Sequence, residues 1–183
     1  MTPYRVRLAT AADAEAICRI YNQGIEDRVA TLETELRTPE ERRQWLQARS
    51  PRHPVIVADL TEPHRAHSTP PTDEAGLAEP VTVVAWGSLN VFNPREAYRF
   101  VADLSVYVER AYRGKGVGDA ILGRLIELAR ERGFHKMVLS AFPDNAGGMA
   151  LYAKHGFRTV GVYREQGLLD GRWVDTIVME KIL

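Results

Sequence analysis

The sequence is poor in three features that would restrict where the protein works and what it binds. It has one cysteine, Cys18, so no disulfide can form within the chain and nothing ties it to an oxidising compartment. Its 24 basic residues balance 24 acidic ones, which argues against a nucleic-acid partner. It also lacks the apolar run of about 20 residues that a membrane span requires, and no secretory signal follows Met1. These absences predict a cytoplasmic protein with a small-molecule or protein partner and with no nucleic-acid or membrane partner.

What remains is the composition of a folded protein. With 45% apolar and 26% charged residues, the 183 residues are enough for one domain, 1–183, with a substantial core. Residues 61–80 differ, because they are rich in proline and poor in bulky apolar side chains; we predict a loop inserted between two strands of a hairpin. His64 and His67 lie three apart in this loop without a third ligand nearby, so we expect no metal.

Hydrophobic periodicity predicts an α/β protein. Helical patterns follow Thr10 or Asp13 and cover residues 38–49, 116–132 and 145–155. Strand patterns cover residues 4–9, 55–58, 81–92, 99–108, 136–141, 157–163 and 173–181. A strand, a glycine-rich turn and the strongest helix therefore follow one another at the centre of the chain.

That turn, residues 113–118 (Arg-Gly-Lys-Gly-Val-Gly), is the most informative segment. Glycines let a ligand approach the backbone closely, and the free N–H groups of a first helical turn bind phosphate. Arg113 and Lys115 add positive charge. The turn is not a Walker A loop, because Gly116 follows Lys115, and its spacing differs from the dinucleotide fingerprint. It fits the pattern Arg/Gln-x-x-Gly-x-Gly/Ala, which alone also fits a helix start with incidental glycines.

Three segments together resemble the GNAT superfamily of acyl-CoA-dependent N-acyltransferases, and the resemblance covers nearly all of the chain. They are Val106-Tyr-Val108, the turn 113–118, and Asn145 followed by Leu151-Tyr152 and Gly156-Phe157. Within the superfamily, residues 21–22, 105–109 and 171–175 are similar to the phosphinothricin and methionine sulfoximine acetyltransferase group. The resemblance implies a GNAT fold: a twisted, mixed, mostly antiparallel sheet of six to seven strands, flanked by about four helices and splayed at the acetyl-CoA site.

It also implies an enzyme that uses acetyl-CoA as co-substrate to acetylate the amine of a small acceptor, an amino acid or amino-acid-like toxin. The pyrophosphate would lie at the turn, and the pantetheine amides would pair with the strand before it. Asn145 matches a cofactor-contacting position, and it also suits the N-cap of the following helix. The implied cofactor residues are Val106, Tyr107, Val108, Arg113, Gly114, Lys115, Gly116, Val117, Gly118, Asp119, Asn145 and Lys154.

For catalysis, the resemblance implies a base at Asp103 and an acid at Tyr152. The group usually has glutamate at the first position, so the shorter Asp103 can need a water to reach the amine; an ordinary strand-entry acid is the alternative. Tyr152 would protonate the departing thiolate, and packing is its alternative role. The N–H of Val106 or Val108 would stabilise the oxyanion.

For the acceptor, the group implies arginines in the hairpin before the catalytic strand, which bind a carboxylate. Arg99 matches one of these positions, whereas the other is Asn93 with Arg95 displaced by two residues. Phe92 and Tyr98 would supply apolar walls. The family also implies a homodimer. Two further functions stay open: a peptide or protein N-terminal acetyltransferase, and an acyl-CoA-binding module without catalysis.

Overall fold

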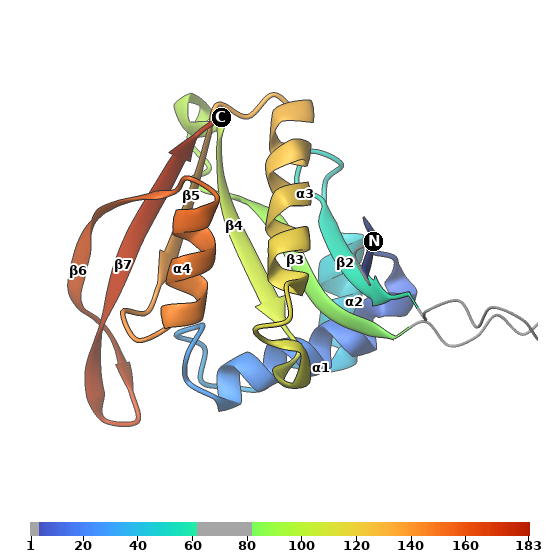
Figure 1. The fold of residues 1–183 in the computed structure, drawn as a ribbon, viewed down its shortest axis with the longest axis horizontal. Helices are drawn as coiled ribbons and strands as arrows, with labels where there is room; N and C mark the ends of the chain where they lie inside the picture. Colours follow the sequence, from blue (N-terminus) through green and yellow to red (C-terminus); the bar gives the residue numbers. More distant parts are fainter. Residues whose placement is uncertain (1–3, 62–81) are drawn as a thin grey trace, which may run out of the picture.

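The computed structural model describes residues 4–61 and 82–183, which form a seven-stranded mixed sheet in the order β1-β2-β3-β4-β5-β7-β6 (Figure 1). The predicted loop 61–80, with His64 and His67, lies outside the described residues except for Thr61. The strands are β1 (Tyr4–Leu8), β2 (Val55–Leu60), β3 (Val83–Val91), β4 (Val101–Val108), β5 (Lys136–Ala141), β6 (Arg158–Leu169) and β7 (Arg172–Ile182).

The sheet opens between β4 and β5. Five strand pairs are antiparallel, and β4 with β5 is the parallel one. Within the described part of the chain these two strands pair only where Val101–Asp103 meets Lys136–Val138. Beyond these residues, β4 continues to Val108 and β5 continues to Ala141 without pairing with each other. The predicted GNAT architecture, with its splayed sheet, is confirmed.

Four helices cover the two faces of the sheet (Figure 1). On one face, α3 (Val117–Glu131) and α4 (Ala146–Lys154) pack over the larger core cluster; on the other, α1 (Ala14–Glu26) and α2 (Pro39–Gln47) cover a smaller, aromatic one. The apolar stripe of α3 is fully buried, and Gly133 ends the helix with a φ of 71°. In the described ranges, no helix combines the length and apolar character needed to cross a membrane.

The hairpin β6–β7 differs from the expected strands of 157–163 and 173–181. Strand β6 runs to Leu169, and the turn is made by Asp170 and Gly171, both with positive φ. Its second half contains Arg-Glu-Gln at 164–166 and pairs with β7 after a shift in register. Nearly every side chain of β6 is exposed, so it carries no alternation that marks a half-buried strand. Cross-strand pairing, which composition does not reveal, therefore sets its length.

Candidate active site

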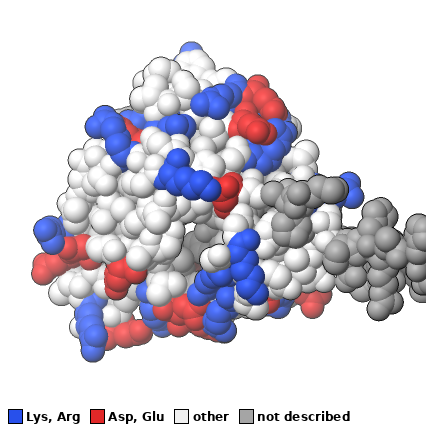
Figure 2. Space-filling model, in the orientation of Figure 1, with Lys and Arg blue, Asp and Glu red and all other residues white. Residues whose placement is uncertain are grey.

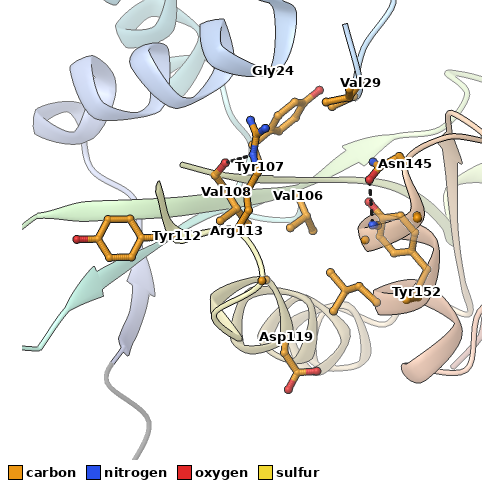
Figure 3. A pocket seen from close by; sticks show the side chains of 18 of the residues that line it. Gly24, Val29, Val106, Tyr107, Val108, Tyr112, Arg113, Asp119, Asn145 and Tyr152 are labelled. Carbon is orange, nitrogen blue, oxygen red and sulfur yellow. Dashed lines mark hydrogen bonds between the residues drawn. The ribbon is translucent and has the colours of Figure 1, made fainter. Parts of the chain in front are cut away.

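A cavity of about 660 Å³ lies at the point where β4 and β5 separate. Its walls come from β4, the turn before α3, the start of α4 and the end of α1 (Figure 3). Figure 2 shows the hollow near the centre of this face, with basic side chains beside it. The predicted site residues that line it are Val106, Tyr107, Val108, Arg113, Gly114, Gly116, Gly118, Asp119, Asn145, Tyr152 and Lys154.

Two predicted cofactor residues do not line the cavity. Val117 is fully buried in the core at the start of α3, where it anchors the helix. The Nζ atom of Lys115 lies 5.2 Å from the centre of the Tyr112 ring, in a cation–π contact. The backbone carbonyl of Lys115 accepts a hydrogen bond of 3.0 Å from the Tyr4 hydroxyl, which ties the turn to β1.

The backbone of β4 is open to the cavity. Glu109 donates its N–H to the carbonyl oxygen of Val84 on β3, so by the alternation of an antiparallel pair Tyr107 also faces β3. Val106 and Val108 then direct their N–H and C=O groups the other way, towards the gap left by β5. No described strand pairs with them there. This edge can receive a ligand that carries amide groups, as an added strand would.

The turn before α3 offers backbone donors. Gly114 and Gly116 have φ values of 73° and 84°, a conformation that side chains rarely adopt, and open space surrounds both. Gly116 is the N-cap of α3 and has no side chain to satisfy the first N–H groups of the helix. Gly118, which lines the cavity, has room for no β-carbon without crowding Leu151 at 3.2 Å. The turn and the helix start therefore form an anion-binding surface.

Acidic residues partly neutralise the positive charge around this turn. The Asp27 carboxylate, at the end of α1, lies 2.6 Å from guanidinium nitrogens of both Arg110 and Arg113. The Arg110 hydrogen bond, more than that of Arg113, lowers the pKa of Asp27. Across the cavity mouth, Lys154 lies 2.7 Å from Asp119, whose side chain points away from β4 in Figure 3. The arginines are therefore already paired, although Arg113 also lines the cavity.

Asn145 has the capping role that the sequence suggested. Its Oδ1 accepts a 3.0 Å hydrogen bond from the N–H of Gly148, at the start of α4 (Figure 3). A β-carbon on Gly148 would lie 2.7 Å from the Asn145 Nδ2 atom, so the glycine is needed for the cap. Asn145 also lines the cavity, which makes capping and ligand contact compatible.

The two predicted catalytic residues come from different elements: Asp103 from β4 and Tyr152 from α4. Asp103 is the last β4 residue paired with β5, and burial raises the pKa of its carboxyl to about 6. Tyr152 is 8% exposed; burial, and then the charge of Asp103, raise its pKa to about 12. Near neutral pH, the carboxylate is thus mostly ionised but accepts a proton readily, while the phenol keeps its proton. Tyr152 lines the cavity, whereas Asp103 is half-buried and is not among the residues that line it.

The hairpin residues expected to bind the acceptor lie elsewhere. Arg95, Tyr98 and Arg99 line a second cavity of about 160 Å³, and none of them lines the larger one. Phe92 is exposed and packs against Tyr98, with ring centres 5.5 Å apart. Arg99 pairs with Glu96 at 2.7 Å. Acceptor binding by these residues stays a prediction from the sequence.

The comparison with protein families identifies the family of this fold. The profile of the acetyltransferase (GNAT) family matches residues 27–157, which include β4, the glycine turn and α4. The chain belongs to the acetyltransferase (GNAT) family.

Relatives of this acetyltransferase span nearly its whole length. A methionine sulfoximine/methionine sulfone acetyltransferase of Pseudomonas paraeruginosa is 31% identical over 96% of this chain and 92% of its own. A solved phosphinothricin acetyltransferase of Sinorhizobium meliloti, in complex with AcCoA, is 29% identical with a TM-score of 0.83, covering 100% and 89% of the two chains. A ribosomal-protein-alanine N-acetyltransferase of Brucella melitensis is 35% identical with a TM-score of 0.82, covering 98% and 99%.

Other parts of this acetyltransferase site could not be found by motif. Gly24 on α1 lines the cavity, and a β-carbon there would lie 3.1 Å from the Tyr107 ring. Val29 and Ala30, after α1, complete that wall. A glycine inside an amphipathic helix is the one signal available, because it costs about 1 kcal/mol relative to alanine and so suggests a close approach.

Proposed function

We propose that the protein is an acetyl-CoA-dependent N-acetyltransferase that moves the acetyl group to the primary amine of a small acceptor. The acceptor is an amino acid or an amino-acid-like toxin of the phosphinothricin or methionine sulfoximine type. The observation that carries the proposal is the unpaired edge of β4 beside the glycine turn, in a chain of the GNAT family. The names of the full-length relatives support the acceptor class.

The residues around the cavity fit acetyl-CoA. Its pyrophosphate suits the N–H groups at the start of α3 together with Arg113 and, from the turn, Lys115. Its pantetheine amides suit the free backbone groups of Val106 and Val108. Asn145, Lys154 and the remaining residues of 113–119 border the same space or support it. When bound, acetyl-CoA supplies the activated acetyl group as a thioester.

Asp103 takes a proton from the acceptor ammonium, directly or through a water, so that the neutral amine can attack. The N–H of Val106 donates to the carbonyl oxygen as negative charge develops on it. Attack forms the new C–N bond, and the nitrogen then releases its second proton to solvent. Tyr152 gives its proton to the sulfur as the oxyanion collapses and the C–S bond breaks. Asp103 returns its proton to solvent. The products are the N-acetylated acceptor and free thiol, and the Tyr152 phenolate regains its proton from solvent.

The test is an amine panel assayed by thiol release from acetyl-CoA, with products identified by mass. We expect free amino acids and their phosphinothricin or sulfoximine analogues to give N-acetylated products above the rate of hydrolysis. A panel in which no amine raises thiol release above hydrolysis would contradict the proposal. Thiol release and acetyl-CoA affinity both unchanged by Asp103→Ala and Tyr152→Phe would instead favour the binding module without catalysis.

A peptide acceptor is the second candidate, favoured by the similarity to the ribosomal-protein-alanine N-acetyltransferase. Peptides with a free N-terminal alanine belong in the same panel. If they are acetylated while free amino acids are not, the acceptor is a polypeptide N-terminus.

The proposal includes a homodimer. Strand β6 is twelve residues long and lies at the edge of the sheet, where unpaired backbone invites association. The hairpin β6–β7 exposes large apolar side chains: Val160, Val162, Tyr163, Leu168 and Trp173. We expect light scattering to give twice the chain mass, and Trp173→Glu to reduce it towards one. The cytoplasmic location and the single domain over 1–183 stay predictions from the sequence.

A further inference from the structure

Four polar residues lie side by side on strands β3 and β4. Ser88 and Asn90 on β3 stand opposite Ser105 and Asp103 on β4. All four share the face covered by α1 and α2, where the next rung is the stacked pair Trp86 and Tyr107. Ser88 is 1% exposed and the other three are half-buried, so the block is shielded from most of the solvent. Buried polar groups of this kind are retained when each finds a partner.

Their hydrogen bonds converge on the Asn90 amide. Its Nδ2 donates to Asp103 Oδ2 and to Ser105 Oγ, both at 3.2 Å. Its Oδ1 accepts from the Ser88 hydroxyl at 3.0 Å. The ionised Asp103 carboxylate fixes which end of the amide faces it, because a carboxylate only accepts; the Ser88 hydroxyl then donates to the remaining Oδ1. All three bonds of the amide are therefore directed, and its donor points at the carboxylate.

We infer that Asn90 is a positioning residue for Asp103: its amide, whose Oδ1 is satisfied by Ser88, holds the carboxylate at the β4–β5 opening and favours its ionised form. The inference rests on the proposed role of Asp103 as base. A hydrogen bond donated to a carboxylate stabilises the charged form and lowers its pKa, here against the opposing effect of burial. Without Asn90, the carboxyl would keep its proton to higher pH, with the Leu104 N–H as its remaining donor.

Besides Asn90, the backbone N–H of Leu104 also lowers the pKa of the Asp103 carboxyl, by less than Asn90 does. Tyr107 on β4 and Tyr152 on α4 are the titratable side chains whose charge interacts with Asp103. Burial raises the pKa of both, so they stay neutral through the range in which the carboxyl titrates. From the α2 side, Arg49 donates to the carbonyl oxygen of Leu89, next to Asn90, and remains a cation across that range.

The experiment measures the Asp103 pKa directly, by carbon NMR of protein labelled at aspartate carboxyls, with the resonance assigned from Asp103→Asn. Asn90→Ala removes the donor; Asn90→Leu removes it while keeping the branched shape, in case the smaller side chain unfolds the strand. We expect either variant to raise the Asp103 pKa by about one unit, since a hydrogen bond to a charged group has roughly that effect. Ser105→Ala, which removes the other partner of the same amide nitrogen, is the matched control and leaves it unchanged.

We also expect a shift in the acid limb of the pH profile of kcat/KM for the acceptor, measured at saturating acetyl-CoA. It should move to higher pH by about one unit in the Asn90 variants and should not move in Ser105→Ala. An unchanged Asp103 pKa in folded Asn90→Ala or Asn90→Leu overturns the inference. A raised pKa in a protein that acetylates no amine supports the Asn90–Asp103 coupling and contradicts the proposed function instead. The two failures are thus distinguishable.

Discussion

Two regions of the cavity differ in how the chain builds them: one offers the backbone of β4 and of the glycine turn, whereas the other is formed where α1 packs against β4. The first side consists of the open edge at Val106 and Val108, the glycine turn and the start of α3, within about a dozen consecutive residues. The second side brings together Gly24 from α1, Val29 and Ala30 after it, and Tyr107 from β4. A nucleotide cofactor that is always the same suits a backbone site, while an acceptor that differs between enzymes suits exchangeable side chains.

The largest effect should come from Asp103→Asn, which separates chemistry from cofactor binding. If Asp103 is the base, kcat falls by about 10²- to 10⁴-fold because proton transfer from the ammonium is lost. The dissociation constant of acetyl-CoA, measured by calorimetry, should stay within about twofold, since its proposed contacts lie on the backbone side. A comparable loss in acetyl-CoA affinity would mean that the two sides of β4 are not independent.

Gly116→Ala tests the backbone side, with Gly133→Ala as its matched control. Both glycines have positive φ and open space around the missing β-carbon, so both substitutions cost about 1 kcal/mol of backbone strain. Only Gly116 borders the cavity. We expect Gly116→Ala to weaken acetyl-CoA affinity about tenfold, equivalent to about 1.4 kcal/mol, and Gly133→Ala to leave the affinity unchanged. Equal effects on affinity would show that general strain, not the anion site, is responsible.

The pH dependence of stability tests whether Asp103 is a buried carboxylate that destabilises the folded protein when ionised. Burial raises the pKa of Asp103 to about 6, so the folded state holds this proton more tightly than the unfolded state does. Its contribution to stability is present at low pH and is lost as the pH rises through about 4 to 6. Asp103→Asn should therefore unfold at a temperature several degrees higher than the original protein at pH 8, and at the same temperature near pH 3.5. Equal unfolding temperatures at pH 8 would contradict the buried, destabilised carboxylate.

The smallest effect concerns the contact that joins the two sides. Asp27, at the end of α1, pairs with Arg113 of the turn. Asp27→Asn should free the guanidinium for phosphate and tighten acetyl-CoA binding by about two- to fivefold, the range of a half-exposed ion pair. Asp170→Asn breaks the Arg28 pair near the same helix end and serves as the control. Weaker binding by Asp27→Asn would show that the carboxylate holds Arg113 in place for the cofactor.

The sequence predicts features that depend on neighbouring residues better than features that depend on contacts between distant residues. The turn at 113–118, the stripe of α3 and the cap at Asn145 depend on neighbouring residues, so local spacing predicts them and they are confirmed as structure. The end of β6 at Leu169 depends on pairing with β7 and was not predicted. The contacts of Asp27 with Arg113 and of Gly24 with Tyr107 join residues more than 80 positions apart.

The acceptor residues predicted in the segment between β3 and β4 lie outside the larger cavity, and their role stays a prediction. Sequence position suggests Arg95 and Arg99 for the acceptor, but the path of the chain places them at a cavity of their own. Asp103 on β4 and Tyr152 on α4, 49 positions apart, are near enough for the charge of Asp103 to raise the pKa of Tyr152. Which residues meet is decided by strand order, which no local pattern contains.

The most direct test of the central claim is a crystal structure with acetyl-CoA bound. The account predicts pantetheine amides paired with the backbone of Val106 and Val108, and pyrophosphate oxygens at the N–H groups of residues 116–119. It also predicts the Tyr152 hydroxyl within about 3.5 Å of the sulfur. Acetyl-CoA bound elsewhere, or with its thioester turned away from Tyr152 and β4, would contradict it.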